Sequence, residues 1–188
     1  MKNQKAFTLI ELIVTITIMV LVGGATFMNF AFTQNKSNLR LTAKDISQSL
    51  YNARNMAING LDSNSGNVSV GVYFDNNDIN KNKIALYSYP YDTDLSTSNL
   101  LNDDNKKLIK EIQFNKSIEL NSVEGKDKFM FLFDAISGVG HYYYWDTGDI
   151  KKSFTGGEIG INISFKGTDS PNLTKNIKYI IGTNIIDY

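Results

Sequence analysis

One carboxylate, Glu11, interrupts an apolar amino-terminal segment, four residues after the bond between Ala6 and Phe7. Cleavage of that bond would give Phe7 a free α-amine, with a pKa of about 8, that is cationic near neutral pH. Four helical residues at about 1.5 Å each place the carboxylate roughly 6 Å along the helix axis from this amine.

A contact between the carboxylate and the amine at about 4 Å, with an effective dielectric near 20, is worth about 4 kcal/mol before desolvation. This gain offsets the cost of about 2.5–3.5 kcal/mol for inserting an acidic residue into a membrane. Glu11 is therefore predicted to set assembly and register, paired with its own amine or that of a neighbouring subunit.

The rest of the chain offers no pattern for catalysis or metal binding. Its 188 residues include no cysteine and one histidine, His141, which excludes cysteine chemistry and multi-histidine metal sites. No nucleophile is assembled with a base. We therefore expect no enzyme, no catalytic residue, no cofactor and no metal ion. The 19 basic and 19 acidic residues balance, so composition indicates no overall attraction to nucleic acid or anionic lipid.

The amino-terminal segment is predicted to be a membrane anchor. No charge occurs from Leu12 to Phe32, and about 20 apolar helical residues cross a bilayer core. Residues 7–32 are the predicted transmembrane part, with the basic end cytoplasmic and the rest outside. The alternative is a secretory signal peptide cleaved near Gly23 and Ala25. Glu11 argues against it, because a carboxylate gains nothing in a peptide that is discarded.

Residues 5–12, KAFTLIEL, resemble the prepilin signature of type IV pilins and pseudopilins. The resemblance implies removal of a leader, residues 1–6, on the cytoplasmic side, followed by N-methylation of Phe7 and retention of the apolar helix. The family usually has glycine before the cleavage site, where this chain has Ala6; the residue is still small, so cleavage is expected. The implied partners are prepilin peptidase, other pilin or pseudopilin subunits, the pilus or secretion assembly platform, and inner-membrane lipid.

A long helix is predicted over residues 7–60, with Gly60 as its carboxy-terminal stop. Apolar residues recur in its second half at alternating intervals of four and three, which makes one stripe along the helix. The stripe consists of Leu39, Ala43, Ile46, Leu50, Ala53 and Ala57. In the apolar half, Gly23 and Gly24 each cost about 1 kcal/mol of helix stability relative to alanine. They are interpreted either as a hinge or melting point during subunit packing, or as sites of close helix packing.

Residues 61–188 are predicted to form an extracytoplasmic, β-rich globular domain. Strand patterns separated by turn-rich stretches occur at residues 68–74, 83–89, 107–114, 128–133 and 158–166. Residues 175–188 are predicted as a closing hairpin with a turn or bulge at Gly182. The predicted fold class is therefore α+β, a long amino-terminal helix packed on an antiparallel sheet, which is the pilin fold that the resemblance implies.

The segment DNNDINKNK, residues 75–83, carries a partial calcium-loop pattern. Asp78, Asn80 and Asn82 match the first ligand positions of such a loop. The loop lacks the turn glycine and the closing glutamate, so a solvated hairpin loop is predicted instead.

The segment HYYYW, residues 141–145, could be a stacking platform for sugars or single-stranded nucleic acid. A structural strand is the preferred interpretation. Because strand side chains alternate between faces, Tyr142 and Tyr144 face one way while Tyr143 and Trp145 face the other. One of these two pairs is predicted to pack inward.

Three further features resemble GspH/FimT-type minor pilins: residues 50–60 in the helix, residues 131–140, and Gly182 near the end. The expected function is structural, as a minor pilin or pseudopilin of a type IV pilus or a type II secretion pseudopilus. The expected location is the cytoplasmic (inner) membrane, with a single span and an external globular domain, and then the filament.

Two alternatives remain. One is an anchored domain that never polymerises, against which Phe7 and Glu11 argue. The other is a DNA- or surface-binding minor pilin involved in DNA uptake or adhesion, because some FimT-like minor pilins take up DNA. Its candidate phosphate contacts are Lys151, Lys152, Lys166, Lys175 and Lys178. Scattered solvated lysines are the preferred interpretation, since removal of the leader leaves 17 basic against 19 acidic residues.

Overall fold

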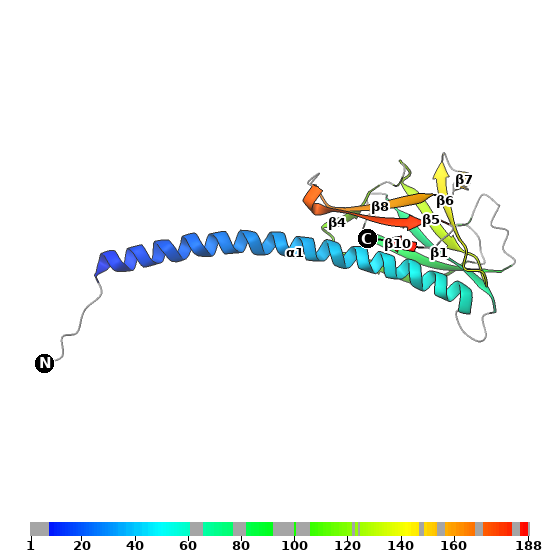
Figure 1. Cartoon of the computed structure of the whole chain (residues 1–188), viewed down its shortest axis with the longest axis horizontal. Coiled ribbons are helices and arrows are strands. Elements are labelled where there is room, and N and C mark those ends of the chain that lie inside the picture. Colours follow the sequence, from blue (N-terminus) through cyan, green and yellow to red (C-terminus); the bar gives the residue numbers. More distant parts are fainter. Residues whose placement is uncertain are drawn as a thin grey trace. The chain divides into compact units, whose positions relative to one another are not determined.

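The computed structural model describes residues 8–60, 66–76, 82–91, 100, 106–121, 123, 125–146, 149–153, 157–167, 171–181 and 185–187. Within them, one long helix, α1 (Leu9–Asn59), precedes strands that pair into two antiparallel sheets (Figure 1). The chain divides into two compact units, residues 1–37 and 38–188. Each unit is described by itself below.

The described part of the first unit is the beginning of α1. The helix continues through Gly23 and Gly24, and a Cβ built at either would meet no atom of another element within 4 Å. The hydroxyls of Thr15, Thr17 and Thr26 each donate a hydrogen bond to a carbonyl three or four residues earlier, at 2.8–3.0 Å. Polar groups in lipid must find such internal partners. By length and composition, α1 is able to cross a membrane.

The second unit begins with the rest of α1, and here the predicted apolar stripe packs into a core. All six stripe residues are at most 2 % exposed. The helix ends at Asn59, and Gly60 follows with a φ of 78°, a left-handed conformation that glycine adopts without the steric cost of a Cβ. The stripe and the stop are both confirmed.

Six strands form the larger sheet, in the order β3-β2-β1-β5-β6-β7. Their bounds are β1 Val68–Asp75, β2 Lys83–Pro90, β3 Lys107–Gln113, β5 Lys128–Phe133, β6 Gly140–Asp146 and β7 Asp149–Ser153. β1 lies near the centre of the sheet, where Val72 is the register partner of both Leu86 in β2 and Phe131 in β5. The first strand after the helix thus organises the sheet.

Four strands form the smaller sheet, in the order β10-β9-β8-β4. Their bounds are β4 Ile118–Leu120, β8 Glu158–Phe165, β9 Thr174–Ile180 and β10 Ile185–Asp187, with a short 3-10 helix, η1 (Pro171–Leu173), before β9. β9 and β10 pair antiparallel, which confirms the closing hairpin. Gly182 lies outside the described residues.

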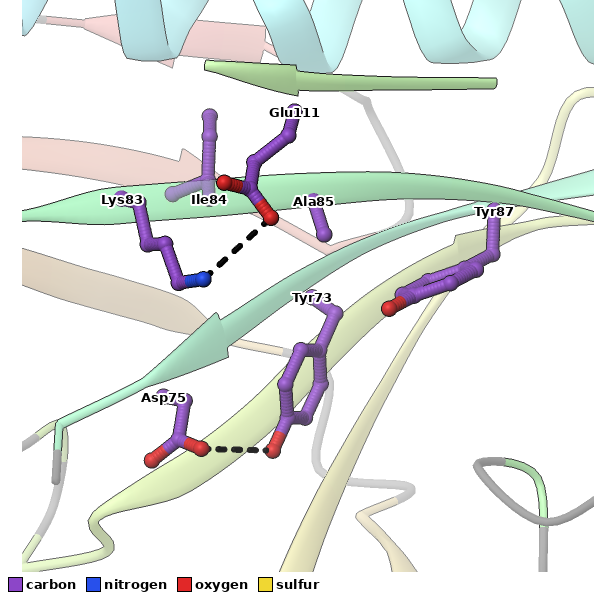
Figure 2. A pocket seen from close by; sticks show the side chains of 7 residues that line it. All are labelled: Tyr73, Asp75, Lys83, Ile84, Ala85, Tyr87 and Glu111. Carbon is purple, nitrogen blue, oxygen red and sulfur yellow. Dashed lines mark hydrogen bonds and ion pairs between the residues drawn. The ribbon is translucent and has the colours of Figure 1, made fainter. Parts of the chain in front are cut away.

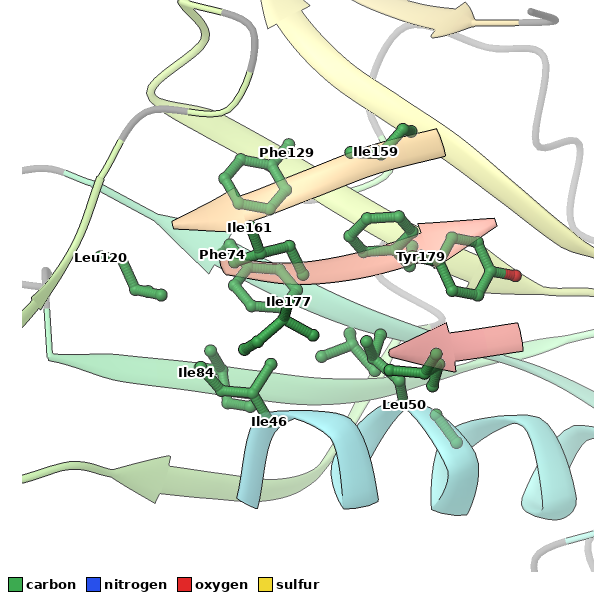
Figure 3. Close-up of a cluster of buried hydrophobic side chains, with 14 of the residues drawn as sticks. Ile46, Leu50, Phe74, Ile84, Leu120, Phe129, Ile159, Ile161, Ile177 and Tyr179 are labelled. Atoms are coloured by element: carbon green, nitrogen blue, oxygen red, sulfur yellow. The ribbon is translucent and has the colours of Figure 1, made fainter. Parts of the chain in front are cut away.

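The main core lies where α1 faces strands of both sheets (Figure 3). Ile46 and Leu50 of α1 share this core with Ile84 of the larger sheet and Ile177 of the smaller one. The rings of Phe131 and Tyr179 meet edge to face at 4.8 Å and join the two sheets directly. Burying one such side chain stabilises the fold by about 1.5–3 kcal/mol. The α+β fold class is confirmed.

A second cluster covers the opposite face of the larger sheet. Its buried members are Tyr89, Leu100, Met130, Leu132 and Tyr143, with Tyr73, Tyr87, Trp145 and Ile150 partly buried against them. Tyr142, in contrast, lies in the main core, with Tyr144 packed against it. The prediction that one pair of HYYYW rings packs inward is confirmed by Tyr142 and Tyr144. The other pair, Tyr143 and Trp145, is packed as well, in the second cluster.

Candidate functional site

The first described residues form a reciprocal set of hydrogen bonds between Thr8 and Glu11. The Thr8 N–H and the Thr8 hydroxyl both donate to Oε2 of Glu11, at 2.9 and 2.8 Å. The Glu11 N–H donates to the Thr8 hydroxyl oxygen at 3.3 Å. The backbone N–H of Leu12 completes the turn with a 3.3 Å hydrogen bond to the Thr8 carbonyl.

This geometry is a capping box, in which Thr8 is the N-cap residue and Glu11 is the third residue of the helix. The first N–H groups of a helix have no intrahelical acceptor, and this arrangement supplies one. The carboxylate also lies at the positive end of the helix dipole. The Thr-x-x-Glu spacing in TLIE is a capping-box signature from which the cap could have been predicted.

Apolar side chains surround this carboxylate along the helix. Leu9, Ile10, Leu12 and Ile13 are all more than half exposed. The exposed surface around Glu11 is thus suited to lipid or to another apolar helix. The interactions that the structure shows for this carboxylate are the hydrogen bonds from Thr8 and its place at the positive end of the helix dipole. Ala6 and Phe7 lie outside the described residues, and the predicted contact with the Phe7 amine stays a prediction.

Four of the five candidate lysines lie on strands of two different sheets, and the fifth lies in a turn. Lys151 and Lys152 are on β7 of the larger sheet, and their side chains are not among those described. Lys166 follows β8, while Lys175 and Lys178 are on β9 of the smaller sheet. Three residues apart on a strand, Lys175 and Lys178 point to opposite faces.

Lys178 already has an acidic partner. Its Nζ lies 2.6 Å from Oε1 of Glu158, and this hydrogen bond raises the pKa of Lys178. A phosphate would have to compete with that carboxylate. The arrangement of the lysines therefore adds nothing to the DNA-binding alternative.

No cluster of histidine, aspartate and glutamate side chains able to hold a metal ion occurs in the described part of the chain. The calcium-loop candidates Asp78 and Asn80 lie outside it, and Asn82 begins the turn into β2. The Asn82 carbonyl accepts a 2.7 Å hydrogen bond from the Phe114 N–H, which ties this turn to the end of β3.

A family match at the amino terminus agrees with the capped, apolar start of α1. Residues 1–27 match the model of the prokaryotic N-terminal methylation motif. The motif implies a type IV pilin-like substrate of prepilin peptidase, with a structural role and with other pilus subunits as partners in general. Together with the apolar helix, it fits a membrane-anchored pilin. Comparisons with curated proteins and with solved structures gave no match.

Proposed function

We propose that this chain is a minor pilin or pseudopilin, a structural subunit of a type IV pilus or a type II secretion pseudopilus. Prepilin peptidase removes residues 1–6, Phe7 is N-methylated, and the subunit enters the filament through α1. The match of residues 1–27 to the methylation motif carries this proposal. The globular domain faces away from the cytoplasm, because the basic leader stays on the cytoplasmic side.

The capping box suggests how Glu11 is tolerated in the membrane before assembly. Both bonds that Glu11 accepts from Thr8 use Oε2, so Oε1 can accept a hydrogen bond from a second donor. In the proposed filament that donor is the methylated amine of Phe7, either from the same chain or from the neighbouring subunit. A charge-assisted bond of this kind is about twice as strong as a neutral one.

The apolar side chains of the first unit support lateral packing rather than simple display of the globular domain. The large apolar side chains that the structure describes from Leu9 to Phe30 are all exposed. Lipid covers them in the membrane, and the helices of other subunits are the proposed cover in the filament. Gly23 and Gly24 leave open space on the helix surface, where a neighbouring helix could approach closely.

Processing by prepilin peptidase is the direct test. The full chain is coexpressed with a prepilin peptidase, extracted from membranes, and examined by intact mass and amino-terminal sequencing. The expected product begins at N-methylated Phe7. A product that begins near Ala25, or one that keeps Met1, would contradict the proposal.

Two substitutions provide matched controls for that test. Ala6→Leu puts a large side chain at the proposed cleavage site and should block processing. Ala25→Leu makes the same change at the site a signal peptidase would use, and should leave processing by prepilin peptidase intact. The opposite pattern would identify a discarded signal peptide.

A further inference from the structure

A small open cavity lies on the face of the larger sheet that the second cluster covers (Figure 2). Its volume is about 110 Å³, and its lining residues are Tyr73, Asp75, Lys83, Ile84, Ala85, Tyr87 and Glu111. Strand register explains why it exists. Ala85 is the register partner of Tyr73 on one side and of Glu111 on the other. The short alanine side chain between two long ones leaves the space empty.

The polar groups around this cavity are already paired by charge. Nζ of Lys83 lies 3.3 Å from Oε2 of Glu111, and Nζ of Lys128 lies 4.0 Å from Oδ2 of Asp75. The Tyr73 hydroxyl donates a 3.3 Å hydrogen bond to the same Asp75 oxygen (Figure 2). A charged ligand would have to displace one of these partners. A neutral ligand with hydroxyl groups can bond to both members of a pair.

The aromatic groups give the cavity a firm apolar wall. The rings of Tyr73 and Tyr87 lie 6.5 Å apart at 62°, and both line the cavity. Trp145 meets the Tyr73 ring edge to face at 5.5 Å, so the tyrosine is held from the side of β6. Lys106 lies over the Tyr87 ring, with Nζ 5.7 Å from its centroid. Burial, followed by the charge of Asp75, raises the pKa of Tyr73, so its hydroxyl stays protonated and can donate.

We propose that this cavity binds one neutral sugar ring, the terminal unit of a glycan. Aromatic walls with a few convergent polar groups are what small-ligand sites share. A purely apolar ligand would make no hydrogen bond to Lys83 or Glu111. A charged ligand would break an existing ion pair. The volume is well below the roughly 300 Å³ at which pockets hold whole drug-sized ligands. It therefore admits one ring, with the rest of the glycan outside.

This proposal goes beyond assembly and does not depend on it. The four rings of HYYYW are packed in the two clusters, which favours the structural interpretation of this segment over a stacking platform. The ring that remains relevant is Trp145, which supports the cavity through Tyr73 rather than binding ligand itself. Trp145 is the single tryptophan of the chain, so its fluorescence reports on the cavity.

Binding is tested with the full chain in a polyoxyethylene detergent, which has no sugar headgroup to compete. The neutral probes are the methyl β-glycosides of glucose, galactose and N-acetylglucosamine. The charged probes are tetramethylammonium chloride and sodium phosphate. Saturation-transfer NMR detects contact with each probe, and Trp145 fluorescence follows the titration. At least one neutral glycoside is expected to bind with a dissociation constant of about 10 mM or tighter.

Three variants locate the binding. Tyr87→Leu removes an aromatic wall, and Glu111→Gln removes one charge of the Lys83 pair. Each is expected to weaken glycoside binding at least about tenfold: Tyr87→Leu through the lost ring surface, and Glu111→Gln through a weakened hydrogen bond to a charged group. Lys178→Ala breaks a similarly exposed ion pair in the smaller sheet and should leave binding unchanged. Far-UV circular dichroism of each variant confirms that it is folded.

Several outcomes overturn the proposal. The first is no contact with any glycoside at about 10 mM. A second is stronger binding of tetramethylammonium or phosphate than of the glycosides, which would assign a charged ligand. The third is glycoside binding that survives both Tyr87→Leu and Glu111→Gln in folded protein, which would place the sugar elsewhere.

Discussion

The backbone N–H of Ile136 donates a 3.0 Å hydrogen bond to the carbonyl of Ala57 and thereby joins the β5–β6 loop to the last turn of α1. The last carbonyls of a helix have no intrahelical donor, and this loop supplies one. Arg54 strengthens the junction, because its Nε donates to the Gly138 carbonyl at 3.4 Å. Ile136 has a φ of 70°, and within the described residues it is the one non-glycine residue with a positive φ. The loop therefore stores backbone strain at the point where it holds the helix.

Relief of this strain should stabilise the domain. A left-handed conformation costs a β-branched residue about 1–2 kcal/mol, and asparagine tolerates it better. The Ile136 side chain is 57 % exposed, so little burial is lost on substitution. Ile136→Asn is expected to raise the free energy of unfolding by about 0.5–1 kcal/mol, measured by denaturant titration.

Val139→Asn is the matched control for that substitution. Val139 is in the same loop and is 42 % exposed, but it is not among the residues with positive φ. It should not gain stability from asparagine. Equal effects of the two substitutions would show that surface polarity, and not backbone strain, accounts for the change.

Gly138 in the same loop allows a close approach between the loop and the helix. A Cβ built on Gly138 would lie 2.6 Å from Cγ1 and Cδ1 of Ile58, and its φ is 62°. Gly125 also has a positive φ, 75°, but open space around it. Both alanine substitutions share the backbone cost of about 1–2 kcal/mol. Gly138→Ala should cost about 1 kcal/mol more than Gly125→Ala because of the overlap with Ile58.

A double variant separates the two causes. Ile58→Ala removes the atoms that the new Cβ would meet, so Gly138→Ala should cost about the same as Gly125→Ala in that background. Denaturant titration of the unsubstituted chain, Gly138→Ala, Ile58→Ala and the double variant gives the coupling free energy between the two positions. An unchanged extra cost in the Ile58→Ala background would place the clash elsewhere.

Local patterns predicted most of the elements. The stripe from Leu39 to Ala57 has helical spacing, and every strand segment from residues 68–74 to 158–166 is rich in β-branched and aromatic residues, so both signals are intrinsic to short windows. β4 and β7 were not predicted. β4 has only three residues, and the DIKKS sequence of β7 carries a high share of charge. Their strand conformation comes from pairing with β8 and β6.

Long-range arrangement accounts for what the sequence could not predict. The division into two sheets depends on pairings such as β1 with β5, some 60 residues apart in the chain. The cavity beside Ala85 exists only because the β1–β2 register and the β2–β3 register set long residues on both sides of it. In contrast, the Thr8–Glu11 cap is a local motif, and its spacing was readable in the sequence.

Alkaline pH should weaken the domain through Tyr143. Burial, and next the charge of Asp134, raises the pKa of Tyr143 to about 12, against about 10 in an unfolded chain. The folded state therefore keeps a proton that the unfolded state loses. The stabilisation is fully present below pH 10 and is lost as the pH rises to about 12, by at most about 1.4 kcal/mol per pH unit.

The slope of unfolding free energy between pH 10 and 12 measures this effect. Tyr143→Phe should flatten the slope, because phenylalanine does not ionise. Tyr179→Phe should do likewise, since burial also raises the pKa of Tyr179 to about 12. Ile46→Val lowers stability by about 1 kcal/mol through lost packing and should leave the slope as it was. A slope that is unchanged in both tyrosine variants would contradict the assignment.

The cap that Glu11 makes and its proposed role in assembly can be separated by substitutions at the two ends of the capping box. Thr8→Ala removes the cap, at a cost of about 1 kcal/mol to the first turn, but keeps the negative charge. Glu11→Gln removes the charge but keeps a cap, because glutamine serves in this position of a capping box. If the charge guides assembly, Glu11→Gln should reduce incorporation into sheared filaments at least about tenfold, equivalent to about 1.4 kcal/mol. Thr8→Ala should reduce it much less, and both variants should insert into the membrane normally. A larger loss with Thr8→Ala than with Glu11→Gln would mean that Glu11 acts through the cap, and that its partner is Thr8 rather than an amine.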